Sequence, residues 1–347
     1  MEPITHFLFG ATLSRAGLNR KTALATATMT LAAEAPDLDI LGRLFGGSVF
    51  GFAHHRGFTH SFLGLPLVAV VVVGFMYLIW RLRGRHTRDP NVPPRWGLLF
   101  GYAYLAGLSH ILLDYTNNYG VRPFWPFSER WYSWDIVFII EPVLLVIMIL
   151  GLILPSLFSL INEEIGARQK GPRGRVAATI ALVGVAACWG FRDYEHRRAV
   201  AMLESQTYQG AEPLRVSAYP YMMNPFRWYG VAETPAAFAM MIVDTLTEVD
   251  PEGRMQFRYK PEETPLTLAA KKSYLGRVYL DWAQYPVTET EQINEGPVAY
   301  VVRFRDLRYA YPGRDTRALG AMVFLDRDLR VVEERFGMRT SSASSRR

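Results

Sequence analysis

Long apolar runs fill the first half of the chain and end before residue 192. Residues 62–80, 96–115 and 136–161 each approach or exceed the roughly 20 residues that a helix needs to cross the hydrocarbon core of a membrane. Residues 176–191 form a shorter, alanine-rich run, and residues 22–35 a weaker one. Residues 4–13 are too short to span as a helix, at about 1.5 Å per residue. The pattern predicts a multi-spanning α-helical membrane domain over residues 1–191.

The pattern changes after residue 191. Residues 192–204 are predicted to form a helical linker that leaves the membrane. Residues 255–260, 276–282, 298–304 and 321–325 partly alternate apolar and polar side chains, which is typical of strands, and Pro and Gly separate them. The predicted fold class is therefore an α-helical multi-spanning membrane domain followed by a small β-rich domain at 205–338. Residues 339–347 are predicted to be a disordered tail.

The charge distribution indicates how the membrane domain is oriented. A formal net charge of +6 would suit a nucleic-acid partner, but the basic residues cluster in the segments 81–95 and 168–175, beside apolar runs. Basic flanks of spans lie on the cytoplasmic side. Because two spans separate these segments, both can be cytoplasmic. We therefore expect the lipid bilayer as partner, no nucleic acid, and an extracytoplasmic location for residues 36–60, 115–135 and the C-terminal domain.

Ionisable residues gather at the predicted outer face. His110 and Asp114 are four apart in an apolar run, so their side chains share one helix face. Ionisable groups in a span are costly and usually face a cavity or a partner. Metal ligation is one explanation, and a buried hydrogen bond between the two side chains is the other. The single cysteine, Cys188, excludes an intrachain disulfide and a cysteine-based zinc site.

Two further segments carry candidate ligands to the same face. His54, His55 and His60 lie within seven residues, and imidazole suits zinc and other transition metals. Asp37 and Asp39 follow a predicted helix and are either ligands or a helix cap. His6 joins this set if the first short helix starts outside, whereas His86 and His196 lie in basic flanks and are expected to be solvated. Such a set exceeds one tetrahedral zinc, and fits two metals or one metal with supporting carboxylates.

Several motifs occur in an order that resembles the YdjM/YfhP-like family of membrane-bound, predicted metal-dependent hydrolases. They are Thr5-His6, the Ala-Pro-Asp-Leu-Asp of 35–39, the His-Arg-Gly-Phe-Thr-His of 55–60, His110 to Asp114, 118–120, 126–128 and Trp131. The resemblance covers roughly residues 1–155. It implies a bacterial-type inner membrane protein that holds one or two divalent metal ions, with zinc as the expected ion. The implied metal ligands are His6, Asp37, His55, His60, His110 and Asp114, supported by Asp39 and Asp135.

One position departs from the family pattern, because Glu141-Pro142 stands where Asp-Pro is expected, which leaves a ligand role for Glu141 open. The leading functional prediction is hydrolysis assisted by a divalent metal at the outer membrane face. Asp39 or Asp114 would act as general base. The location favours a lipid or lipid-linked phosphoester as substrate. A metal transporter and a non-catalytic scaffold, whose β domain binds a partner, are the alternatives.

Overall fold

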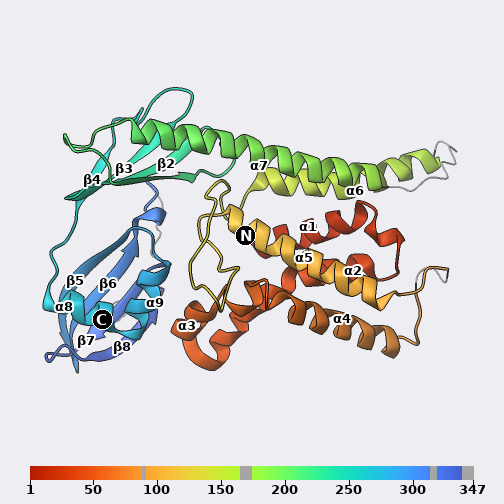
Figure 1. The fold of residues 1–347 in the computed structure, drawn as a ribbon, viewed down its shortest axis with the longest axis horizontal. Coiled ribbons are helices and arrows are strands. Elements are labelled where there is room, and N and C mark those ends of the chain that lie inside the picture. Colours follow the sequence, from red (N-terminus) through yellow and green to blue (C-terminus); the bar gives the residue numbers. More distant parts are fainter. Residues whose placement is uncertain (88–90, 165–173, 313–318, 338–347) are drawn as a thin grey trace, which may run out of the picture. The chain divides into compact units, whose positions relative to one another are not determined.

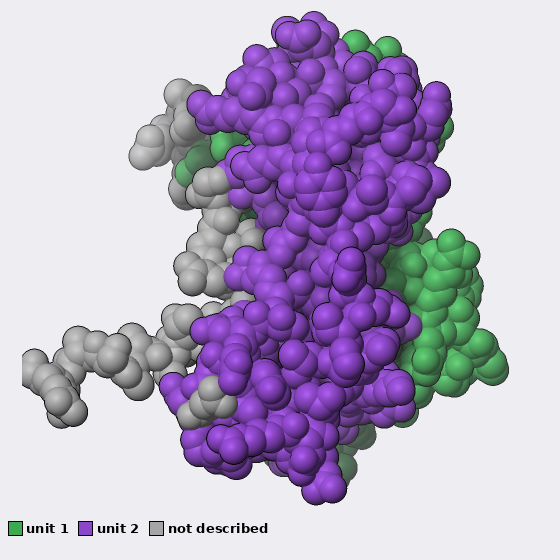
Figure 2. Space-filling view, turned by 90° about the vertical axis from the view of Figure 1, so that its left-hand side faces the viewer, with its two compact units in different colours: residues 1–39, 56–198, 219–228 green, residues 40–55, 199–218, 229–347 purple. Residues whose placement is uncertain are grey.

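The computed structural model describes residues 1–87, 91–164, 174–312 and 319–337 (Figure 1). The chain divides into two compact units, which Figure 2 shows in green and purple. Unit 1 contains Met1–Asp39, Arg56–Arg198 and Tyr219–Trp228, and unit 2 contains Ile40–His55, Ala199–Ala218 and Tyr229–Arg347. The chain therefore passes between the units more than once. The predicted disordered tail at 339–347 lies outside the described residues.

Apolar helices form most of unit 1. They are α1 (Pro3–Arg15), α2 (Ala25–Glu34), α4 (Leu65–Leu82), α5 (Trp96–Thr116), α6 (Pro142–Glu164) and α7 (Arg175–Glu204), joined in part by the 3-10 segments η1 (Leu18–Arg20), η2 (Ala35–Gly42) and η3 (Phe58–His60). Within the described part of the chain, α4, α5 and α7 are long and apolar enough to cross a membrane, and Pro142–Pro155 is a shorter apolar helix. These helices fit the predicted membrane domain. The number of crossings stays a prediction.

Small residues let the helices of unit 1 approach closely. A Cβ atom on Gly10 of α1 would lie 2.8 Å from the Cβ of Ala33 in α2, and one on Gly107 of α5 would lie 2.8 Å from Leu65 at the start of α4. Such contacts are typical of helix pairs in membranes, where van der Waals packing drives association. Buried alanines of α2 and α5 pack in one cluster with Val72 of α4. This packing holds the end of α2 against the middle of α5.

Two four-stranded sheets follow the helices. The first has the order β1-β2-β3-β4, with β1 (Arg215–Pro220), β2 (Arg227–Glu233), β3 (Ala237–Asp244) and β4 (Gln256–Tyr259). The second, in unit 2, has the order β5-β6-β7-β8, with β5 (Pro286–Glu295), β6 (Val298–Asp306), β7 (Ala321–Leu325) and β8 (Val331–Phe336), each paired antiparallel to the next. The predicted strands at 255–260, 298–304 and 321–325 correspond to β4, β6 and β7. The C-terminal antiparallel sheet thus agrees with the predicted β-rich region.

One predicted strand is wrong, because residues 276–282 belong to a helix. Helices α8 (Pro265–Lys272) and α9 (Tyr274–Trp282) precede the second sheet, and η4 (Leu307–Tyr309) follows β6. The side chain of Ser273 accepts a hydrogen bond from the backbone N–H of Gly276 and caps α9. Leu275, Tyr279 and Trp282 are buried at helical spacing. The segment is so short that its apolar and polar side chains also fit the alternating pattern of a strand, which is why the sequence predicted a strand there.

Unit 2 also contains a helix from the N-terminal half of the chain. Helix α3 (Arg43–His54) occupies much of the segment predicted as an outer loop. Its Phe52 is 1% exposed, stacks on Phe336 of β8 at 3.8 Å between ring centroids, and meets Trp282 of α9 edge-on at 5.4 Å. Helix α3 is therefore part of the core of unit 2, although both of its ends continue directly into unit 1.

Candidate metal centre

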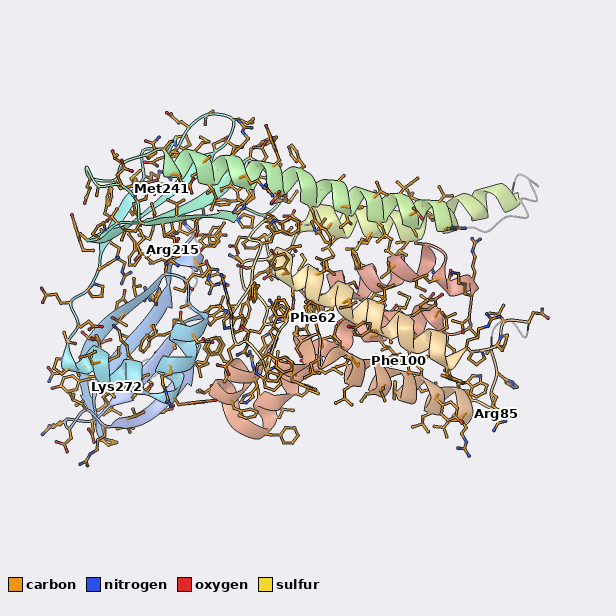
Figure 3. The ribbon with its side chains drawn as sticks, viewed as in Figure 1. Phe62, Arg85, Phe100, Arg215, Met241 and Lys272 are labelled. Atoms are coloured by element: carbon orange, nitrogen blue, oxygen red, sulfur yellow. The ribbon has the colours of Figure 1, made fainter. Side chains whose placement is uncertain are left out.

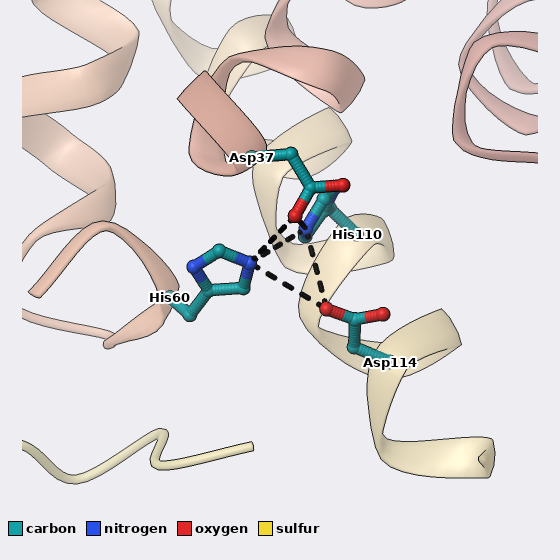
Figure 4. Close-up of side chains that lie close together, drawn as sticks. All are labelled: Asp37, His60, His110 and Asp114. Atoms are coloured by element: carbon teal, nitrogen blue, oxygen red, sulfur yellow. Dashed lines mark hydrogen bonds and ion pairs between the residues drawn. The ribbon is translucent and has the colours of Figure 1, made fainter. Parts of the chain in front are cut away.

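Four side chains from three parts of unit 1 converge on one point. Asp37 lies in η2, His60 ends η3, and His110 and Asp114 are one turn apart on α5. One ligand atom from each lies within 4.8 Å of the other three (Figure 4). His60, His110 and Asp114 are fully buried, and Asp37 is half-buried. The structure thus brings together four of the six ligands that the resemblance implied.

The distances between these ligand atoms suit a single small cation. His60 Nε2 lies 3.0 Å from His110 Nε2, 3.2 Å from Asp37 Oδ1 and 3.5 Å from Asp114 Oδ2. His110 Nε2 lies 3.6 Å from Asp37 Oδ1 and 3.5 Å from Asp114 Oδ2. Around a tetrahedral zinc with bonds of about 2.0–2.2 Å, ligand atoms are roughly 3.3–3.6 Å apart. Two histidines and two aspartates also form a ligand set that zinc accepts.

Contacts behind the two imidazoles turn the Nε2 atom of each toward this point. His110 Nδ1 lies 2.6 Å from the backbone carbonyl of Ala33, at the end of α2. His60 Nδ1 lies 3.4 Å from Asp39 Oδ2, which also accepts a hydrogen bond from the Thr59 hydroxyl at 3.1 Å. A carbonyl or carboxylate on the far ring nitrogen is the usual support of a metal-binding histidine. Asp39 therefore lies behind a candidate ligand, a position that suits the supporting role implied by the resemblance, and its role as general base stays a prediction.

The two oxygens of the Asp114 carboxylate differ in their hydrogen bonds. Its Oδ1 accepts a hydrogen bond from Arg56 Nη2 at 2.7 Å and also contacts the Met1 amino nitrogen. Its Oδ2 is buried and has no hydrogen-bond donor among the described residues. Because an unmade hydrogen bond at a buried polar atom costs free energy, such an atom calls for an explanation. A cation between Oδ2 and the two Nε2 atoms would supply it.

His6 lies beside the group of four. Its ring is fully buried, stacks on His110 at 3.8 Å between centroids, and places Nε2 3.5 Å from Asp114 Oδ1. Neither ring nitrogen has a hydrogen-bond partner in the part of the chain that the structure describes. His6 is therefore near enough to support the centre or to contribute a fifth ligand.

The other predicted residues lie outside the group of four. His55, Asp135 and Glu141 contribute no atom to it. Glu141 is fully buried, pairs with Arg192 Nη2 at 2.7 Å and accepts a hydrogen bond from the backbone N–H of Met223 at 3.1 Å. This explains the longer side chain at position 141 as part of an ion pair between the start of α6 and α7. His86 is exposed as expected, whereas His196 is half-buried and lies 5.2 Å from the Trp228 ring.

The charges around the centre shift the protonation of two groups outside the candidate spans. Burial alone would lower the pKa of His60, but its contacts with the carboxylates of Asp114, Asp37 and Asp39 outweigh burial and raise this pKa to about 10. Burial would raise the pKa of Asp37, but hydrogen bonds to His110 and His60 lower it. In the metal-free protein the centre therefore holds an imidazolium between carboxylates, and a metal would displace its proton.

Sequence reasoning missed two residues near the centre, Arg56 and Glu34. Arg56 was read only as part of the His-Arg-Gly motif, and its pairing with Asp114 depends on the tertiary fold. Glu34 is half-buried at the end of α2, where burial raises its pKa to about 7. An acid three residues before Asp37 was the only available signal for Glu34.

The fold and the centre define a membrane protein with apolar helices that carry a buried site able to hold a metal ion, followed by a C-terminal domain that combines helices with antiparallel strands. Residues 1–199 match the family described as YdjM inner membrane protein, and the chain belongs to this family. Residues 265–347 match the YfhP C-terminal alpha/beta plait domain, which agrees with α8 and α9 beside the second sheet.

The chain is also similar in sequence to a named bacterial protein. The uncharacterised protein YfhP of Bacillus subtilis (strain 168) is 27% identical over 154 residues, which are 42% of this chain and 43% of the relative. The match therefore spans less than half the length of either protein. No solved structure matches the chain.

Proposed function

We propose that this protein is a membrane-bound, metal-dependent hydrolase that acts on the phosphoester of a lipid or a lipid-linked molecule at the outer membrane face. The observation that carries the proposal is the convergence of Asp37, His60, His110 and Asp114 around a buried oxygen without a donor, Asp114 Oδ2. A group that only joined helices would be expected to satisfy its polar atoms internally. One zinc ion is the occupant that the distances favour.

Asp37, His60, His110 and Asp114 would hold the divalent metal, which would supply Lewis acidity and lower the pKa of a water molecule toward about 7. The chain's own residues supply the surroundings. Asp39 and the Ala33 carbonyl orient the two imidazoles, and burial keeps bulk water away from three of the four ligands. Asp39 or Asp114 remains the proposed general base, and Glu34, whose pKa burial raises to about 7, is a further candidate.

The class of substrate is proposed from the position of the centre near the ends of the candidate spans. Asp114 lies in the last turn of α5, and α4 begins five residues after His60, so both elements place the centre near the ends of candidate spans. A site at that depth is reached most directly by the head group of an amphiphile. The charge pattern of the flanking segments supports an inner-membrane location with the site and the C-terminal domain extracytoplasmic.

Metal content tests the proposal first. We expect one equivalent of zinc in the detergent-purified full chain, measured by elemental mass spectrometry, and loss of that zinc in the His60→Ala/His110→Ala double variant. The matched control is His54→Ala/His86→Ala, because both of these histidines are exposed. Equal metal contents near zero for the wild type and the double variant, after incubation with zinc and manganese, would exclude the hydrolase and leave the scaffold.

Turnover is measured next, with mixed micelles of phosphatidylcholine and phosphatidylglycerol. The expected result is release of a water-soluble, phosphate-bearing head group by the wild type and the control variant only. Zinc flux into proteoliposomes without hydrolysis would instead show the transporter, and metal binding with neither property would contradict both functions.

A further inference from the structure

Arg56 contacts one carboxylate of the centre, Asp114, and the carboxylate that supports His60, Asp39. It lies between α3 and η3, is 5% exposed, and belongs to unit 1. Its side chain reaches Asp114 and its backbone reaches Asp39, and these acids come from different elements.

The guanidinium group of Arg56 is held on three sides. Nη2 donates to Asp114 Oδ1 at 2.7 Å, Nη1 donates to the backbone carbonyl of Gly120 at 2.8 Å, and the group lies over the ring of Tyr119 at 4.6 Å. A planar group with forked donors fixes the orientation of a carboxylate in a way that a lysine ammonium cannot. Together with the Met1 amino nitrogen and Asn117 Nδ2, which also contact Oδ1, Arg56 holds this oxygen and leaves Oδ2 facing the two imidazoles.

The backbone of Arg56 fixes the second carboxylate. Its N–H donates to Asp39 Oδ2 at 2.9 Å, and the same oxygen lies 3.4 Å from His60 Nδ1. Arg56 has a φ of 56°, in the left-handed region that residues with a Cβ atom adopt at a cost. Glycine would relieve that cost. An arginine retained in this conformation indicates that its side chain contributes something that glycine cannot.

We propose that Arg56 is the positioning residue of the centre, whose guanidinium restricts Asp114 to one free oxygen while its backbone N–H holds Asp39 against His60. The inference rests on the proposed function, because it assumes that the free oxygen binds a metal. It adds that Arg56 itself touches neither metal nor substrate and acts through Asp114 and Asp39. Coordination at the metal should therefore depend on a residue that is not a ligand.

Cobalt(II) in place of zinc gives a readout other than activity, because its visible absorption reports the number and arrangement of its ligands. In Arg56→Gln, Asp114 Oδ1 loses its guanidinium donor and keeps only its contacts with the Met1 amino nitrogen and Asn117, so the carboxylate can turn relative to the imidazoles. We expect cobalt affinity to fall by roughly 10–100-fold, as is usual when the support of a ligand is removed. We also expect the absorption at saturation to change in shape and intensity. Arg56→Gly should show the same spectral change with a higher melting temperature than Arg56→Gln.

Two further variants separate positioning from general damage to the fold. Arg122→Gln removes another buried arginine, which lies over Trp131 at 4.5 Å, and should keep the wild-type affinity and spectrum. Arg56→Lys keeps the charge but cannot reach Asp114 and Gly120 together, so it should bind cobalt with an altered spectrum. If Arg56→Gln does not fold, Arg56→Lys decides the question.

The outcomes are distinct. A wild-type spectrum and affinity in Arg56→Gln or Arg56→Lys would show that Arg56 only supports the loop, and would overturn the inference while leaving the proposed function intact. Tighter cobalt binding in Arg56→Gln would show that the positive charge of Arg56 only repels the metal ion, and would also overturn the inference. A wild type that binds no cobalt or zinc would overturn both this inference and the proposed function.

Discussion

Charged side chains are buried in both units, and the two sites differ in how completely their polar atoms are satisfied. In unit 2, the carboxylate of Asp306 accepts hydrogen bonds from the backbone N–H groups of Gln284, Tyr285 and Arg308 and from the Arg308 side chain. Arg308 also donates to the Trp282 carbonyl at 3.1 Å and lies over the Trp282 ring. Figure 3 draws the described side chains on the ribbon and labels Lys272 of α8, which belongs to the same unit. Every oxygen of this carboxylate has a donor.

In unit 1, Asp114 is equally buried but keeps one oxygen without a donor in the described structure, and both nitrogens of the neighbouring His6 are also without partners. A satisfied network stabilises a fold, whereas an incomplete one costs free energy unless a ligand completes it. The comparison therefore separates a structural ion pair from a candidate metal centre, although both consist of buried charged residues.

The largest expected effect breaks the structural pair. Arg308→Met fills a similar volume but leaves Asp306 without its counter-charge, and removal of one partner of a buried pair costs about 3–5 kcal/mol. We expect the free energy of unfolding, measured with denaturant on the full chain in detergent, to fall by that amount. Zinc content should stay at the wild-type level. A loss below about 1 kcal/mol, or a loss of zinc, would contradict the distinction between the two sites.

The second expected effect, spread over several pH units, concerns the incomplete site and its dependence on pH. The pKa of His60 in the metal-free folded protein is raised to about 10 from its ordinary 6.5, so the protonated ring contributes stability that is fully present below about pH 6.5 and lost as the pH rises through about 10. One proton changes the free energy of unfolding by at most about 1.4 kcal/mol per pH unit. We expect that decline in chelator-treated protein, and its disappearance in His60→Gln.

The control for this effect is His86→Gln, since His86 is exposed and should leave the slope unchanged. Added zinc should remove or reverse the decline in the wild type, because a metal takes the place of the proton. An identical slope in the wild type and in His60→Gln would mean that His60 is not the group that titrates, and would weaken the resemblance of the site to a metal centre.

The sequence alone was sufficient to predict the apolar helices and one pair of residues in the site, His110 and Asp114. His110 and Asp114 are four residues apart, and helical spacing alone places them on one face. The charge pattern placed Asp37 and His60 at the same membrane face and the family motifs marked them as ligands, but their approach to α5 depends on how α2, α4 and α5 pack. His55 has the same chemistry as His60, and nothing in the motif itself separates them. The structure does so by placing His60, and not His55, at the end of η3 beside Asp37.

Other features depended on tertiary contacts that no local pattern encodes. Arg56 and Asp114 are 58 residues apart in the sequence, so their contact depends on the tertiary fold. The left-handed backbone of Arg56 is likewise visible only in the structure. Glu141 was considered as a ligand because of its position in a motif, and only the fold shows that Arg192 neutralises it. Helix α9 was missed because a short segment rich in aromatic and β-branched residues is compatible with either period.

The smallest expected effect tests whether the contribution of an ion pair to the free energy of unfolding depends on its burial rather than on the distance between its charged atoms. Arg258 Nη2 lies 2.6 Å from Glu289 Oε1, closer than Arg56 lies to Asp114, but these side chains are 31% and 35% exposed. Exposed pairs contribute about 0–1 kcal/mol, because water solvates both charges when the pair is broken. Arg258→Ala should therefore lower the free energy of unfolding by less than about 1 kcal/mol, measured as for Arg308→Met. A loss comparable to that of Arg308→Met would show that distance alone sets the strength of such pairs, and the contrast between satisfied and incomplete buried sites would lose its physical basis.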